Sequence, residues 1–432
     1  MTVFPYLDLN LWPNKILEHR FFLPVCFSIF LLSRLLLVAF IPVSPSADAE
    51  WYFSCGARLA ETGLYYERGV PTAFWPVGYP AFLGGLFFIT GKSILAAQLA
   101  NLVFSGCSFW LLYKYVLATF RNNLAARLSV LLLTIYPNNA VYVQAVLTES
   151  LYTFLILGVC VLLLSDKKPI KLVLTSLILG LATLLKTQTI MLTPILITLS
   201  FLNRWSFREC IHAATYGVFG TALALLVVMP WTWRNYTVFG EFVLVSTNGG
   251  QALLAGNNDS VVNDYLHDYS LSDPLYLQAG YNGPFNQVQA DKRARQLGKQ
   301  WILNNPSKFI ALIPKKFFRL WAIDGEGEWI YQAGTPWYDQ HATWFRLVRY
   351  ANQAYYYILL AVFSLSAWNL LRGGLSPHQC LGLAIIAFFT FLCMVFSGQS
   401  RYHFPAMPFI IAFVSYEIIQ RITRPNAAHN NT

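Results

Sequence analysis

Long apolar stretches separated by short polar segments make up most of the chain. A helix that crosses a bilayer needs about 20 apolar residues. The stretches that approach this length lie at or near residues 21–42, 94–118, 125–136, 141–164, 172–186, 189–202, 212–232, 352–371, 380–397 and 405–420. This pattern predicts an all-α polytopic membrane protein with about ten transmembrane helices. Because 125–136 and 172–186 are short, one or two of the ten are also compatible with re-entrant segments.

The first apolar stretch raises the alternative of a cleaved signal peptide. Ala47-Asp48-Ala49 resembles a small-x-small cleavage site. A signal peptide has an apolar core of roughly 7–15 residues, however, and residues 21–42 exceed that length. We therefore expect this stretch to be retained as a transmembrane helix.

Composition agrees with a membrane location. Hydrophobic residues occupy 56% of the 432 positions and charged residues only 12%, whereas a soluble domain is about 25% charged. This balance excludes a soluble fold. The formal net charge of +10 does not indicate nucleic-acid binding, because the basic residues are scattered and form no basic stripe. They are better explained as topology signals and contacts with membrane lipids that carry negative charge.

Short loops rich in Lys and Arg lie on the cytoplasmic side of a membrane protein. If the N-terminus is cytoplasmic, the short outer loops hold only Lys186 and Arg401. The inner loops then hold Arg121, Arg127, Lys167, Lys168, Lys171, Arg204, Arg208, Arg372, Arg421 and Arg424. The bias predicts a multi-pass protein of the bacterial inner membrane with both termini cytoplasmic.

This orientation divides the chain into four regions. Residues 1–232 form an N-terminal transmembrane region with a long first outer loop at 44–93. Residues 233–350 form an extramembrane, periplasmic insertion, residues 351–424 the C-terminal transmembrane helices, and residues 425–432 a disordered tail. Within the insertion, we expect turns in the Asn/Gly-rich stretch 246–259, a polar helix around 287–304, and a helix in the membrane interface at 308–322.

Carboxylates close to membrane depth are costly to bury and are therefore functional candidates. Asp48 and Glu50 follow the first span directly, and Glu149 lies near the outer end of the span at 141–164. Each could act as a general base. The alternative is a capping role at a helix N-terminus, through Ser46 or Asp48 in the first case and Thr148 in the second.

Three cations lie at the outer ends of apolar stretches. Lys186 and Arg401 are the two exceptions to the orientation bias, and Arg234 joins them at the outer end of the stretch 212–232. Together they could bind a lipid phosphate, Arg through a bidentate fork and Lys as a point charge. The alternative is that each side chain extends to the membrane interface and binds no ligand.

Aromatic residues are further candidates. Trp75 and Tyr79 lie in the segment Ala73-Phe-Trp-Pro-Val-Gly-Tyr-Pro80, whose prolines and glycine predict a rigid, non-helical surface. Tyr402 and His403 follow Arg401. Aromatic faces of this kind suit sugar rings or lipid chains.

The order of these motifs resembles a known family. An acidic pair after the first span, Trp-Pro-x-Gly-Tyr-Pro, Thr-Glu, Pro-Trp-x-x-Arg-Asn-Tyr and Arg-Tyr-His-Phe-Pro follow one another over residues 20–420. The chain is similar to the bacterial GT-C superfamily members related to protein O-mannosyltransferases and to the aminoarabinose transferase of lipid A. Phe74-Trp75 replaces an acidic–basic pair of the aminoarabinose transferases, and the chain is shorter, so the resemblance does not assign the sugar.

The resemblance implies a glycosyltransferase that uses a polyprenyl-phosphate-linked sugar. It implies a catalytic role for Asp48, with Glu50 as its neighbour, and donor phosphate contacts by basic residues of the outer face, for which Lys186, Arg234 and Arg401 are the candidates. The expected reaction transfers the sugar, with inversion, to a hydroxyl of lipid A, a glycan or a protein at the outer face of the inner membrane. Asp48 would be the base and Glu149 a further acidic candidate.

No cofactor is required by these residues, although Asp48, Glu50 and Glu149 could in principle hold a divalent metal. The seven cysteines show no zinc-binding spacing. Two alternatives remain open at this point. One is a transporter or flippase of lipid-linked sugars, which would place its charges along a midplane path, and the other is an O-antigen ligase or polymerase. A membrane scaffold would not explain the outer cations.

Overall fold

The computed structural model describes residues 12–165, 168–202, 204–263, 279–281, 284–324 and 326–423. The predicted C-terminal tail, Lys167 and Arg424 lie outside these ranges. The N-terminal half contains α1 Trp12–Glu18, α2 Phe22–Phe40, α3 Asp48–Thr62, β1 Tyr66–Glu67, β2 Val70–Pro71, α4 Gly78–Thr90, α5 Ile94–Phe120, α6 Asn123–Ile135, α7 Pro137–Gln144, α8 Glu149–Leu163, α9 Lys168–Leu185, α10 Thr189–Phe201 and α11 Phe207–Phe239.

The C-terminal half is also helical. It contains α12 Gly249–Ala255, α13 Asp259–Asn263, α15 Gln287–Asn304, α16 Pro306–Trp321, α17 Glu326–Gly334, α18 Tyr338–Gly373, α19 Pro377–Val395, the 3-10 helix η1 Ser400–Ala406 and α20 Met407–Thr423. The prediction of an all-α membrane protein is therefore confirmed, with one small β-hairpin as its only sheet in the described residues.

Among the described residues, six helical segments are long and apolar enough to cross a membrane: α2, α5, α11, α18, α19 and the segment Ser400–Thr423. A seventh is reached if α7 and α8 count as one bent span. The helices α4, α6, α9 and α10 are apolar but shorter. The predicted count of about ten spans is therefore not confirmed, because hydropathy alone does not separate a short buried helix from a span.

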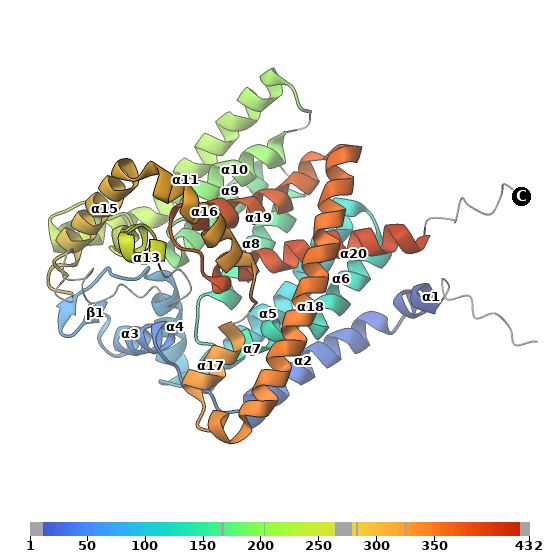
Figure 1. Ribbon diagram of the computed structural model, residues 1–432, viewed down its shortest axis with the longest axis horizontal. Helices are drawn as coiled ribbons and strands as arrows, with labels where there is room; N and C mark the ends of the chain where they lie inside the picture. The colour runs from blue at the N-terminus through green and yellow to red at the C-terminus, as the bar shows by residue number, and fades with distance from the viewer. Residues whose placement is uncertain are drawn as a thin grey trace, which may run out of the picture.

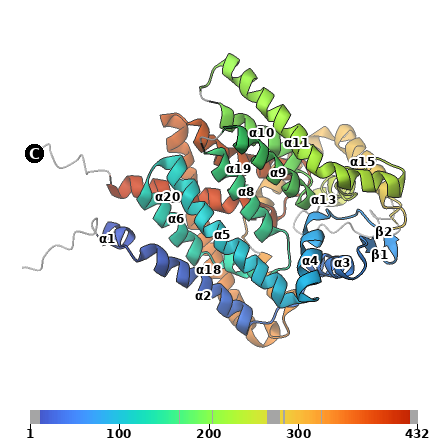
Figure 2. The same cartoon turned by 180° about the vertical axis from the view of Figure 1, so that it is seen from behind.

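The elements are segregated toward two ends of the molecule. Figures 1 and 2 show α1 and the end of α20 at one end, and α3, α4, the β-hairpin and α15 at the other. The helix α20 is buried on nearly all sides and packs against α5, α6, α18 and α19. The side of the membrane on which each end lies stays a prediction.

The predicted outer loop 44–93 is itself folded. The helices α3 and α4 approach closely because Gly56 has no side chain: a Cβ atom there would lie 2.6 Å from the Cβ of Leu83. Between them, Arg68 and Gly69 have φ angles of 48° and 80°, as a two-residue hairpin turn requires. The non-helical prediction for 73–80 is wrong from Gly78 onward, since α4 begins there and Pro80 is tolerated in its first turn.

The predicted continuous span 141–164 is also wrong. The axes of α7 and α8 differ in direction by 118° across the break at residues 145–148. Side-chain amides of α5 satisfy the carbonyls that the break leaves free: Asn101 Nδ2 lies 2.7 Å from the carbonyl oxygen of Ala145, and Gln98 Nε2 3.2 Å from that of Gln144. The break places Glu149 at the first position of a new helix.

The insertion is helical where turns were expected. The stretch 246–259 contains α12, and glycines in this helix and directly after it serve close packing. A Cβ on Gly250 would lie 2.0 Å from the carbonyl oxygen of Asp291, and one on Gly256 2.0 Å from that of Phe396. The predicted helices at 287–304 and 308–322 are confirmed as α15 and α16. Gln287, the first residue of α15, accepts a hydrogen bond from the Ala73 amide at 2.8 Å, so the insertion contacts the first outer segment.

The tight contact at Gly250 gives a stability prediction. Gly250→Ala should destabilise the fold by about 1–3 kcal/mol, because the added methyl group has no space between α12 and α15. Gly85→Ala is the matched control, since nothing lies within 4 Å of a Cβ at that exposed position of α4. The control should be neutral or stabilising by about 0.5–1 kcal/mol. Thermal unfolding of the purified variants in detergent measures both, and equal transition temperatures for the two variants would contradict the packing argument.

Candidate active site

Asp48 occupies the first position of α3. The preceding residue, Ala47, has φ 47° and ψ −119° and makes no side-chain cap. An alanine rarely adopts a positive φ, so the chain holds a strained backbone directly before this carboxylate. The predicted capping role of Ser46 or Asp48 is therefore not observed. The amide groups of the helix N-terminus instead favour the negative charge of Asp48.

Arg401 is the partner of Asp48. The guanidinium Nη1 lies 2.7 Å from Asp48 Oδ2, and the two side chains are 19% and 25% exposed. Arg401 belongs to η1, the short 3-10 helix before α20. Two residues that the sequence analysis placed in separate groups therefore form one ion pair, which solvent can still reach.

Glu149 and Lys186 form a second, more buried pair. Lys186 Nζ lies 3.2 Å from Glu149 Oε1, and the side chains are 12% and 4% exposed. Glu149 begins α8, and Lys186 follows the last residue of α9. The end of α9 contacts the start of α4, where a Cβ on Gly78 would lie 2.7 Å from the Leu184 carbonyl group. Thr148 makes no side-chain cap, so the predicted capping alternative is not observed here either.

The two ion pairs lie close to one another around Tyr52 of α3. Burial raises the pKa of the Tyr52 hydroxyl well above its usual range, Asp48 raises it further, Arg401 opposes these effects, and Glu149 adds to them. All three charges therefore lie close enough to act on one hydroxyl group. The site combines two carboxylates at helix N-termini with two cations, next to a ring of aromatic side chains.

The aromatic candidates lie beside these pairs. Trp75 is half-buried and contacts Trp51 and Tyr52 edge to face, with ring centroids 6.4 Å and 6.0 Å apart. Tyr79 is fully buried and also contacts the Tyr52 ring, at 5.7 Å. Trp75 stays partly exposed, whereas Tyr79 supports the ring of Tyr52 from within.

Three other candidates take no part in the two ion pairs. Glu50 is exposed and accepts a hydrogen bond from Ser54 Oγ at 2.7 Å. Arg234 does not join the other cations, because its guanidinium donates to the carbonyl oxygens of Thr72 at 2.8 Å and Tyr65 at 3.0 Å and so holds the β-hairpin against α11. His403 is 1% exposed and cannot line an open substrate loop.

Sequence reasoning missed two buried charges near η1. Asp324 is bound to His403, at 3.1 Å between Oδ1 and Nε2. Lys316, which was expected at the membrane interface, is fully buried and donates to Asn257 Oδ1 at 2.8 Å and to the Val395 carbonyl oxygen at 3.3 Å. The amphipathic pattern of 308–322 gave no signal that would separate Lys316 from Lys315.

Metal binding was left open by the sequence. In the part of the chain that the structure describes, His, Cys, Asp and Glu side chains form no group of three or more that could hold a metal ion. Glu50, the third carboxylate proposed for such a site, is bonded to Ser54 instead. The expectation that no cofactor is required stays a prediction.

Comparisons with known proteins address the family. A family model described as dolichyl-phosphate-mannose-protein mannosyltransferase matches residues 75–233. The fold is similar to the apo oligosaccharyltransferase of Archaeoglobus fulgidus, with a TM-score of 0.54 at 13% identity over 95% of this chain and 51% of that one. It is also similar to the oligosaccharyltransferase AglB of the same organism, solved with an inhibitory peptide and a dolichol-phosphate, with a TM-score of 0.51 at 12% identity over 93% and 51%.

These similarities agree with the resemblance that the order of motifs predicted. The chain shares the fold of the archaeal oligosaccharyltransferases. A more distant likeness is to ArnT of Cupriavidus metallidurans bound to undecaprenyl phosphate, with a TM-score of 0.43 at 14% identity over 93% of this chain and 77% of that one. No curated protein sequence matches the chain. The chain spans about half the length of the archaeal oligosaccharyltransferases that it matches.

The buried pair Glu149–Lys186 gives a coupling prediction. Glu149→Gln should destabilise the fold by about 3–5 kcal/mol, because it leaves the Lys186 ammonium without its counter-charge in a buried position. The double variant E149Q/K186M removes both charges and should recover a large part of that loss. The free energies of unfolding of the wild type, both single variants and the double variant, measured in detergent, give the coupling between the two side chains. If the double variant is as unstable as the sum of the single variants, the two side chains are not coupled.

Lys316 gives a pH prediction. Burial lowers the pKa of its ammonium from 10.5 to about 7 in the folded protein. Between these values the unfolded chain binds more protons than the folded one, so the free energy of unfolding should rise with pH. The measurement is the difference in stability between the wild type and Lys316→Met, which keeps the side-chain volume and does not titrate. A difference that stays constant from pH 7 to pH 10 would contradict the burial of this charge.

Proposed function

We propose that the protein is a membrane glycosyltransferase that moves a sugar from a polyprenyl-phosphate carrier to an acceptor hydroxyl at the outer face of the membrane. The observation that carries this proposal is the Asp48–Arg401 ion pair, a carboxylate and a cation held 2.7 Å apart at a partly exposed position. The GT-C fold and the match to a mannosyltransferase family that uses a dolichyl-phosphate sugar support it. We further propose a bacterial inner membrane with both termini cytoplasmic.

The cations of the site support the proposal of a donor that carries a phosphate. One archaeal oligosaccharyltransferase of this fold was solved with a dolichol-phosphate and an inhibitory peptide. In this chain, Arg401 and Lys186 each face a carboxylate, at 2.7 Å and 3.2 Å. A phosphodiester gains a second negative charge when its sugar leaves, and nearby cations stabilise that charge most in a poorly hydrated site. Arg401 suits this role because its guanidinium can share donors between Asp48 and a phosphate.

Asp48 is the proposed general base. It would accept the proton of the acceptor hydroxyl as that oxygen attacks the anomeric carbon, while the bond from that carbon to the phosphate oxygen breaks and the phosphate keeps the electron pair. A single displacement of this kind inverts the anomeric centre. Its position at a helix N-terminus holds the carboxylate rigidly, as general-base chemistry needs.

A transporter of lipid-linked sugars is the alternative that one observation favours. Transporters often carry broken helices at their substrate site, and the break between α7 and α8 places Glu149 at a helix N-terminus. Transport would move the lipid-linked sugar across the bilayer without consuming it. Counting free polyprenyl phosphate released per sugar moved therefore separates the two functions.

The base assignment gives the central activity prediction. Asp48→Asn should lower sugar transfer by about 10²–10⁴-fold, because the amide cannot accept the hydroxyl proton, while binding of the donor lipid is kept. Glu61→Gln is the matched control, since Glu61 is an exposed carboxylate on the same helix. Transfer is measured in proteoliposomes supplied with a polyprenyl-phosphate sugar, and mass spectrometry of envelope lipids and glycans with and without the protein identifies the acceptor. Wild-type transfer by the Asp48 variant would remove the assignment.

A further inference from the structure

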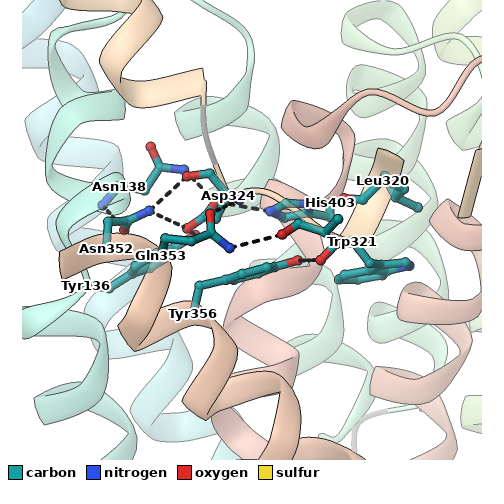
Figure 3. Close-up of polar contacts among 10 residues, drawn as sticks. Tyr136, Asn138, Leu320, Trp321, Asp324, Asn352, Gln353, Tyr356 and His403 are labelled. Atoms are coloured by element: carbon teal, nitrogen blue, oxygen red, sulfur yellow. Dashed lines mark hydrogen bonds and ion pairs between the residues drawn. The ribbon is translucent and has the colours of Figure 1, made fainter. Parts of the chain in front are cut away.

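A buried polar cluster includes His403, two residues after Arg401, and the proposed chemistry does not use it. Figure 3 shows side chains from several elements converging on Asp324, which follows the end of α16. His403 reaches it from η1, Tyr136 and Asn138 from the start of α7, and Asn352 from α18. Asp324 and His403 are each 1% exposed at their side chains.

The hydrogen bonds of His403 join η1 to α16 and to Asp324. Its Nδ1 lies 2.6 Å from the carbonyl oxygen of Leu320, which can only accept, so Nδ1 is the donor of this bond. Its Nε2 lies 3.1 Å from Asp324 Oδ1.

Three further side chains bond to the carboxyl group of Asp324. Tyr136 contributes its hydroxyl at 2.7 Å, Asn138 its Nδ2 at 2.6 Å, and Asn352 its Nδ2 at 3.1 Å. With His403, they give both carboxyl oxygens two partners each. A buried polar group whose hydrogen bonds are all made is held in one position.

The C-terminal end of α16 adds further hydrogen bonds to this cluster. The last carbonyl groups of a helix lack partners within the helix and form its negative pole. Here His403 bonds to the carbonyl of Leu320, the Tyr356 hydroxyl to that of Trp321 at 2.9 Å, and Gln353 Nε2 to that of Ala322 at 3.0 Å. The rings of Trp321 and Tyr356 stack on the imidazole with centroids 5.3 Å and 5.1 Å away.

One turn earlier, α16 also contacts residues 395–398, which precede η1. Lys316 donates to the carbonyl of Val395, and a Cβ on Gly398 would lie 2.2 Å from the carbonyl oxygen of Lys316. The segment 395–403 therefore contacts α16 at two places, residues 395–398 and His403. Arg401 lies between them, and its guanidinium reaches Asp48.

We propose that Asp324 and His403 are positioning residues, which fix η1 on the end of α16 and thereby hold Arg401 at the distance from Asp48 that sugar transfer requires. This inference rests on the proposed function. Neither residue touches the substrate, since both are buried. Removing the hydrogen bonds of either should leave the fold assembled but give Arg401 a wider range of positions.

The test is a double-mutant cycle on sugar transfer. His403→Gln keeps one donor for Asp324 and loses the bond to Leu320. It should lower kcat by about 10–100-fold, the usual cost of losing a residue that orients a functional group. In an Arg401→Lys background, where the guanidinium geometry is already lost, the same change should cost less than about threefold. If His403 only supports the fold, His403→Gln should lower kcat by the same factor in both backgrounds.

Glu417→Gln is the matched control for stability. Glu417 is a buried carboxylate on α20, bonded to Asn369 Nδ2 at 2.8 Å and to Arg421 Nε at 2.7 Å, and Figures 1 and 2 place the end of α20 away from α3. It should weaken the fold without changing kcat per folded molecule. The transfer cycle and this control are measured on the same purified proteins.

Two outcomes would overturn the proposal. They are wild-type kcat in His403→Gln and an equal loss in both Arg401 backgrounds. The proposed function fails separately, if Asp48→Asn transfers sugar at the wild-type rate. An inactive Asp48→Asn together with an additive cycle would leave the function and remove only the positioning role.

Discussion

The ion pair between Asp48 and Arg401 joins two parts of the chain that hydropathy treats as unrelated. Asp48 begins the first helix after α2, and Arg401 lies in the turn that leads into the buried helix α20. Bringing a carboxylate and a guanidinium together at a partly buried position requires that the backbone on both sides be held firmly. Much of the surrounding architecture supplies this: the strained residue Ala47, the contacts of α16 with the loop before Arg401, and the close contact of α4 with α9.

Two helix N-termini and two cations give this site its electrostatic character. Asp48 and Glu149 each occupy a first helical position, where free backbone amides stabilise negative charge. Arg401 and Lys186 then balance the carboxylates, so the four side chains carry no net charge as a group. For the proposed reaction, such a group would admit a singly charged phosphodiester and stabilise the second charge that develops on the departing phosphate, because its cations are already in place. The break between α7 and α8 is what brings Glu149 into this group.

The sequence predicted the fold class and the charged residues better than it predicted how they combine. Apolar stretches of bilayer length were enough to predict an all-α membrane fold, and the order of short motifs predicted the proteins that this fold resembles. Asp48, Glu149, Lys186 and Arg401 were all found because each is an ionisable residue at the end of an apolar stretch. Their pairing could not be predicted, since it depends on contacts between elements far apart in the chain.

Other errors have equally specific causes. Glycines in 246–259 have the composition of turns, but Gly250 and Gly256 allow close helix packing that only a three-dimensional contact reveals. Arg234 has the same chemistry as Arg401 and a similar place at a span end, yet backbone carbonyls of the β-hairpin occupy it. The sequence predicted that His403 lines a substrate loop and that Lys316 lies at the membrane interface. Both are buried because α16 packs over residues 395–403, and no sequence pattern indicates that contact.

The most direct measurement is a structure of the protein with a non-transferable polyprenyl-phosphate sugar. The account predicts that the phosphate oxygens lie within hydrogen-bonding distance of Arg401 and Lys186, with the Asp48 carboxylate on the opposite side of the anomeric carbon. A phosphate bound at the end of the molecule that carries α1 and the end of α20, with Asp48 and Arg401 still paired and remote from it, would contradict the account.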